Sequence, residues 1–169
     1  MRSMVTGAGD MSISSRSANT IAVITVHGTG DTAEHLDGPK WFQRGSVFSD
    51  ALKDRLSERG VDIEIAPFIW SGANSASERE AGAEDLAKVI KHAARRFCGV
   101  HVIGHSHGGN VANTAALLLR WGRDRRGSSK HAMTSLTTIG TPFLNSRSSA
   151  MQSICGFLFL IVTSASVPL

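Results

Sequence analysis

The strongest constraint on the fold of this chain is a regular alternation of short apolar runs and longer amphipathic stretches between residues 21 and 139. The apolar runs are rich in β-branched residues and too short for helices, so they favour strands buried on both faces. The stretches between them repeat apolar residues every three or four positions, which is the period of a helix packed on one side. This alternation predicts an α/β fold, with a mostly parallel sheet, helices on both faces and right-handed crossovers.

Four strands and three helices are predicted from this pattern. The strands are expected at 21–26, 62–70, 99–103 and 133–139, and the helices at 47–59, 77–97 and 110–121. Residues 31–45 are rich in Gly, Asp and Pro and lack a period, so they are expected to form a loop. The first strand is expected to be central, whereas Pro67 indicates that the second lies at an edge or bends late.

Chain length and local composition divide the sequence into three parts. With 169 residues, the chain has the length of one domain. Residues 1–20 contain no apolar run of signal-peptide type and are expected to be a flexible leader. Residues 21–145 carry the alternating pattern, and residues 146–169 form an apolar tail that is uncharged from Ser148 onward.

The apolar tail leaves two interpretations open. A spanning helix needs about 20 mostly apolar residues. The tail has that length, and its segment from Ile154 to Val162 is almost purely apolar, but Ser, Thr and Gln residues interrupt the rest. Membrane contact through residues 151–167 is one expectation. The other is a tail buried as a helix or strand, or a chain end whose natural partner sequence is missing. The expected location is cytoplasmic, with membrane association in the first case.

Charge and cysteine content weigh against several classes of function. The 18 Lys and Arg residues against 14 Asp and Glu residues give a net charge of +4, which is spread over predicted helix surfaces. No recognition module accompanies this excess, so nucleic acid is not an expected partner. Cys98 and Cys155 have neither metal nor redox spacing, and both are expected to be reduced and partly buried.

A serine flanked by glycines lies between the third predicted strand and the third predicted helix. The segment Gly104-His105-Ser106-His107-Gly108 fits the pattern Gly-x-Ser-x-Gly, which is unspecific in a chain with 17 glycines. Its position is more informative, because active sites of parallel sheets form at the carboxyl ends of the strands. A serine at such a tight turn needs small neighbours, and Gly104 and Gly108 provide them. The following helix would direct free backbone N–H groups at an anionic oxygen beside Ser106.

Three motifs in this order resemble the lipase and esterase branch of the α/β-hydrolase fold. They are His27-Gly28-Thr29-Gly30 after a strand, Gly104-His105-Ser106-His107-Gly108-Gly109 before a helix, and Thr138-Ile139-Gly140-Thr141-Pro142-Phe143. The segment Phe68-Ile69-Trp70-Ser71-Gly72 is also similar to sequences of bacterial hydrolases of this kind. The resemblance covers residues 20–145 and implies a partial α/β-hydrolase fold.

The resemblance implies a role for four residues of this chain. Ser106 would be the catalytic nucleophile, and the backbone N–H of His107 would be one donor of the oxyanion hole. The loop at Gly28 and Thr29 would supply the second donor, and the Thr29 N–H is favoured. The substrate would be a small-molecule or lipid ester, and no cofactor is implied.

The resemblance also implies an acid and a histidine after the nucleophile, and this sequence departs from that pattern. The only acid after Ser106 is Asp124, at the far end of the helix that follows the serine. His131 precedes its strand and would lie at the opposite rim of the sheet. We therefore expect a truncated serine hydrolase that is weak or inactive alone. The oligomeric state is left open.

Several conspicuous side chains are expected to be structural. His27 is expected to hold its loop, since the base in this fold follows the nucleophile. His101 lies inside a predicted strand, and Trp70 is expected in the core. His105 and His107 form a His-x-His pair, but no further ligand follows them, so no metal is predicted.

Two other function classes remain open at this point. Residues 28–33, Gly-Thr-Gly-Asp-Thr-Ala, fit the dinucleotide-binding pattern Gly-x-Gly-x-x-Gly/Ala after a strand. However, no acid stands at the end of the next strand, and residues 34–45 lack the pattern of the helix that would bind a pyrophosphate. The other alternative is a catalytically silent α/β domain that contacts a membrane or a partner through its tail.

Overall fold

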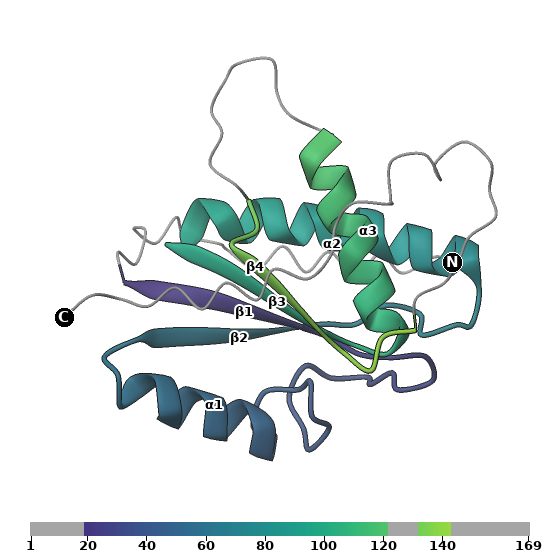
Figure 1. The fold of residues 1–169 in the computed structure, drawn as a ribbon. Helices are drawn as coiled ribbons and strands as arrows, with labels where there is room; N and C mark the ends of the chain where they lie inside the picture. The colour runs from purple at the N-terminus through teal and green to yellow at the C-terminus, as the bar shows by residue number, and fades with distance from the viewer. Residues whose placement is uncertain (1–18, 122–131, 143–169) are drawn as a thin grey trace, which may run out of the picture.

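The computed structural model describes residues 19–121 and 132–142, which form a four-stranded parallel sheet and three helices (Figure 1). The strands are β1 (Thr20–Val26), β2 (Asp62–Phe68), β3 (Gly99–His105) and β4 (Ser135–Ile139), and the helices are α1 (Val47–Ser57), α2 (Ala76–Arg96) and α3 (His107–Trp121). The predicted α/β class with a parallel sheet is confirmed. Apart from residues 19 and 20, the predicted leader lies outside the described residues, and so does the tail.

The strand order is β2-β1-β3-β4, and each neighbouring pair is parallel. β1 is central, as its continuous apolar run predicts, and its last five residues are buried. β2 lies at an edge of the sheet, as Pro67 predicts. Pro67 is paired with Thr25 of β1 on one side only, so its missing N–H disrupts no second ladder.

The helices cover both faces of the sheet, with α1 on one face and α2 and α3 on the other (Figure 1). α1 packs against β2, whereas α2 and α3 pack against each other and against β3. The main core lies under α2 and α3 and buries residues Ala22, Ile24, Val26, Val100 and Val102 of the strands and Ala83, Leu86, Ile90, Val111 and Ala115 of the helices. Among the described residues, no helix is long and apolar enough to cross a membrane.

The ends of β3 and α3 differ from the prediction. β3 continues to His105 because that residue pairs with Ile139 of β4, and α3 begins at His107 instead of residue 110. Ser106 is therefore the single residue between strand and helix. The expectation for Cys98 was partly wrong, since its thiol is free, as expected, but exposed. Asp124, His131 and Cys155 lie outside the described residues.

Candidate active site

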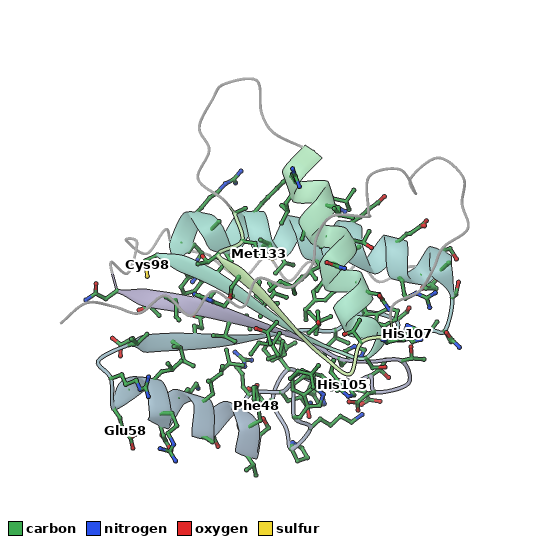
Figure 2. All side chains as sticks on the ribbon, in the orientation of Figure 1. Phe48, Glu58, Cys98, His105, His107 and Met133 are labelled. Carbon is green, nitrogen blue, oxygen red and sulfur yellow. The ribbon has the colours of Figure 1, made fainter. Side chains whose placement is uncertain are left out.

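The chain leaves the neighbouring strands β1 and β3 toward opposite faces of the sheet. The loop after β1 leads to α1 on one face, and β3 leads directly into α3 on the other (Figure 1). Ligands of open α/β sheets bind at such a topological switch point, at the carboxyl ends of the strands. The two segments that meet here are residues 27–29 and 105–107, so the fold brings together motifs that are far apart in sequence. Figure 2 shows His105 and His107 at this end of the sheet, and Cys98 at the other.

Ser106 has the backbone of a strained turn. Its φ of 52° is the only positive value of a non-glycine residue in the described part of the chain. A left-handed conformation costs a residue with a side chain about 1–2 kcal/mol. Backbone hydrogen bonds on both sides hold it: the Ser106 N–H donates to the Ile139 oxygen at 2.9 Å, and the Gly109 N–H donates to the Ser106 oxygen at 2.9 Å. A serine on a strained strand-to-helix turn of this kind can expose its hydroxyl above the sheet.

The glycines around Ser106 allow α3 to begin directly against the end of β1. A Cβ atom at Gly108 would overlap the carbonyl oxygen of His27 and would lie 2.5 Å from that of Val26. A Cβ atom at Gly104 would lie 2.7 Å from the Cα of Gly109. Gly104 and Gly108 are thus required because the neighbouring backbone leaves no space for a Cβ atom, and not only because the turn is tight.

The loop after β1 touches the serine at Gly28. A Cβ atom at Gly28 would lie 3.0 Å from the Ser106 Cβ and 3.4 Å from the His105 Nδ1. The backbone N–H groups of Thr29 and His107, the residues that follow this contact on each side, donate to no acceptor among the described residues. Two donors without an acceptor among the described residues therefore flank the contact of Gly28 with Ser106, one in the loop after β1 and one at the first residue of α3.

His27 holds the Gly28 loop in place, in agreement with the structural role predicted for it. Its ring is fully buried, with Nδ1 2.8 Å from the Gly28 oxygen and Nε2 3.2 Å from the backbone N of Trp70. A carbonyl can only accept and a backbone N–H can only donate, so both contacts fit a neutral ring with its proton on Nδ1. The indole N–H of Trp70 donates back to the His27 oxygen at 2.9 Å.

The state of His27 makes the fold sensitive to acid. Burial lowers the pKa of His27 below its ordinary value of about 6.5. The unfolded chain then takes up a proton more readily, so the stabilisation by neutral His27 is complete above pH 6.5 and is lost as the pH falls below it. We expect the free energy of unfolding in urea to fall between pH 7 and pH 5.5, and His27→Gln to reduce this pH dependence.

The control for this titration is His92→Gln, which changes an exposed histidine of α2. It should leave the pH dependence as in the original chain. Some dependence should also remain in His27→Gln, because burial lowers the pKa of His101 as well. If His27→Gln and His92→Gln had the same pH profile, a neutral buried His27 would be contradicted.

Two aromatic residues that the sequence analysis did not single out form a wall beside the site. Phe42 is fully buried, and its ring centroid lies 4.9 Å from that of His27. Trp41 packs its ring at 72° to that of His105, with 5.9 Å between the centroids. Thr25 of β1 also donates its hydroxyl to the Phe42 oxygen at 2.5 Å. The loop predicted at 31–45 is thus an ordered element anchored on the sheet.

The third motif lies against the same turn. The side-chain Nδ2 of Asn110 donates to the Pro142 oxygen at 3.0 Å, and it lies 3.3 Å from the His107 Nδ1. A Cβ atom at Gly109 would overlap the Thr141 side chain. The segment after β4 therefore packs directly on the first turn of α3, and all three sequence motifs meet at Ser106.

Among the described residues, no histidine or carboxylate contacts the Ser106 hydroxyl. No hydrogen bond joins the Ser106 hydroxyl to another described group, and the neighbouring His107 faces Asn110. His101 is bonded to the Ser135 hydroxyl at 2.8 Å within the sheet. The described residues also contain no cluster of His, Cys, Asp or Glu side chains that could hold a metal ion.

Because Ser106 has a strained positive φ, a glycine at this position is expected to be more stable than an alanine. Glycine adopts a positive φ freely, so Ser106→Gly is expected to raise the free energy of unfolding by about 1 kcal/mol relative to Ser106→Ala. Ser135→Gly and Ser135→Ala are the matched pair, because Ser135 lies in β4 without a positive φ. Glycine should be the less stable residue there, by about 0.5–1 kcal/mol. Urea titrations of the four variants measure both differences, and the same sign in both pairs would contradict a strained serine.

The dinucleotide-binding pattern at residues 28–33 is not followed by a helix. The chain remains in a loop until α1 begins at Val47, so the helix that this pattern places directly after its glycines is missing. Instead, the Gly30 N–H donates to the Gly72 oxygen at 2.9 Å. The glycines thus serve a close contact between two loops.

Comparison with models of known protein families gives no match for this chain. Comparison with curated protein sequences gives none either.

Proposed function

We propose that this chain carries the nucleophile and the oxyanion hole of a serine hydrolase of the lipase and esterase type, which acts on carboxylic esters. The observation that carries this proposal is the positive φ of Ser106 at the switch point of the sheet, with the Gly28 loop in contact with its side chain. The second part of the proposal, that the chain is weak or inactive alone, rests on the sequence, in which Asp124 is the only acid after Ser106, and on His107, which faces Asn110.

The proposed reaction begins at the serine hydroxyl. The Ser106 Oγ attacks the ester carbonyl carbon and gives up its proton to a base that the described residues do not supply. The carbonyl oxygen becomes an oxyanion, which accepts hydrogen bonds from the N–H groups of His107 and Thr29. Each such donor lowers the activation barrier by roughly 3–4 kcal/mol, because the charge it faces exists only in the transition state.

Collapse of this intermediate breaks the ester C–O bond, and the alcohol leaves with a proton. The acyl group remains on Ser106 until water attacks the same carbonyl carbon and releases the carboxylic acid. Without its base, a triad enzyme keeps only the residual acceleration of the oxyanion hole and of binding, roughly 10³ to 10⁴ over water. Small-molecule and lipid esters both fit this chemistry.

Covalent labelling tests the nucleophile directly. We expect the full chain to react with a fluorophosphonate probe slowly, over hours, with the added mass located on the peptide that contains Ser106. Ser106→Ala should abolish this modification, whereas Ser71→Ala, which removes an exposed serine after β2, should leave it unchanged. Labelling that persists in Ser106→Ala, or a folded chain that excess probe leaves unmodified, would refute the proposed nucleophile.

Ester hydrolysis tests the second part of the proposal. We expect the chain alone to hydrolyse p-nitrophenyl butyrate weakly or not at all. Turnover at ordinary enzyme rates that is lost in Ser106→Ala would support the nucleophile and contradict the missing base.

A further inference from the structure

The face of β3 and β4 on the α1 side is not covered by any described helix. Val100, Val102 and Leu136 point into the core under α2 and α3, so the alternate residues of both strands point to the α1 side. These residues are His101, Ile103, His105, Ser135, Thr137 and Ile139, and we call the surface they form the β3–β4 face. α1 itself packs against β2, at the far edge of the sheet.

Exposure differs sharply between the two halves of this side of the sheet. On the half that α1 and its preceding loop cover, Val23 of β1 and Ile65 of β2 are only 3% and 2% exposed. On the β3–β4 face, Ile139 is 48% exposed and Thr137 is exposed as well. Burial of the β3–β4 face to the same degree would need a second covering segment on this side of the sheet.

The chemistry of the β3–β4 face restricts what can cover it. It contains no Asp, Glu, Lys or Arg residue. Two of its four polar side chains, His101 and Ser135, are hydrogen bonded to each other at 2.8 Å, and the ring of His105 packs on Trp41. A covering segment without charged residues fits this face, since a charge laid on it would lose hydration and meet no side chain of Asp, Glu, Lys or Arg.

We propose that residues 148–169 of this chain cover the β3–β4 face. This segment has no charged residue and contains the apolar run from Ile154 to Val162. It comes after β4 in the chain, and the five residues from 143 to 147 can span up to about 16–18 Å. This length allows a turn from Pro142, the last described residue, onto the adjoining face. The inference does not rest on the proposed hydrolase function, because it is argued from the exposure and charge of the β3–β4 face alone.

A thiol pair tests this contact in the full chain. Cys155 is a native cysteine inside the apolar run, and Cys98→Ser removes the other cysteine. In this background, Ile139→Cys or Thr137→Cys places a second thiol on the β3–β4 face. Thr138→Cys is the matched control, because Thr138 is exposed on the same strand but points to the α3 side. Oxidation at low protein concentration, followed by intact mass and non-reducing electrophoresis, measures disulfide formation.

We expect a disulfide within one chain to form at least tenfold faster with Ile139→Cys or Thr137→Cys than with Thr138→Cys. Disulfides between two chains would overturn the proposal in favour of a second copy on this face. Equal rates for all three cysteines, or no disulfide with either face position, would also overturn it. Loss of the disulfide when phosphatidylcholine vesicles are added, together with flotation of the chain, would assign the segment to a bilayer.

A fluorescence measurement covers the case in which an added cysteine prevents folding. The parent chain for this test is Cys98→Ser, in which an environment-sensitive dye labels Cys155 alone. The dye should emit at shorter wavelength in this parent than after the further change Ile139→Lys, because a lysine on the β3–β4 face would displace an apolar segment. Thr138→Lys should leave the emission as in the parent. Identical spectra for the two lysine variants would contradict the proposal.

Discussion

Replacing Gly108 with alanine is expected to lower the free energy of unfolding by at least about 3 kcal/mol. The new Cβ atom would overlap the carbonyl oxygen of His27 and would lie 2.5 Å from that of Val26. Both oxygens belong to the backbone at the end of the central strand, so neither can rotate away as a side chain would. Relief of the overlap requires α3 to move away from β1, which would open the core at Val111 and Ala112.

The control for this substitution is another helical glycine. A Cβ atom at Gly82 of α2 would lie 3.3 Å from the Trp70 Cβ, which needs only a small adjustment. The higher helix propensity of alanine offsets part of that cost, so Gly82→Ala should change the free energy of unfolding by less than about 1 kcal/mol. Urea unfolding followed by circular dichroism measures both variants. Equal stabilities would mean that α3 does not begin directly against β1.

The sheet and its helices could be predicted from the sequence because their signal is local. The apolar run that became β1 and the regular spacing of Leu86, Ile90 and Ala93 in α2 each describe one element without reference to another. Pro67 indicated the edge position of β2 through a missing N–H, which is again a local property. The order of the strands depends on contacts between distant segments, and no local pattern determines it.

The turn at Ser106 was predicted from its composition, but its boundaries were not. Ser106 and the glycines beside it identified the turn, yet β3 was expected to end two residues too early and α3 to begin three residues too late. Glycine and histidine contribute no hydrophobic period, so the pattern faded where pairing of His105 with Ile139 extends the strand. The exposed Cys98 was also misjudged, because burial of a cysteine near a strand end depends on the whole fold.

The largest omission was the role of the loop between β1 and α1. Its composition predicted a loop, and it is one, but the adjacent pair Trp41 and Phe42 is unusual in an otherwise polar segment. Two large aromatic side chains in such a loop indicate that it folds back on the core. The side-chain Nε2 of Gln43 stabilises the loop by donating to the backbone carbonyl oxygens of His35 and Asp37 at 2.7 and 3.2 Å. The aromatic pair is thus the sequence signal for a loop that packs on the core beside His27 and His105.

Phe42→Ala is therefore expected to cost about 3–5 kcal/mol of stability, the range for a large aromatic side chain removed from a core. Phe42 is 0% exposed and packs on His27, which in turn holds the oxygen of Gly28. The loss should thus spread from the core to the loop that contacts Ser106. Val47→Ala is the control, because Val47 is 88% exposed at the start of α1 and should change the stability by less than about 0.5 kcal/mol.

The two effects of Phe42→Ala can be separated by hydrogen exchange. In conditions where the variant remains folded, the amides of residues 28–45 should exchange faster than in the parent chain, while those of β3 should lose protection only as far as global stability falls. Phe42→Leu should cost less and keep most of the loop protection, because it retains part of the apolar contact with His27. Uniform loss of protection across the sheet and the loop would mean that Phe42 stabilises the core without positioning Gly28 and Thr29 beside the serine.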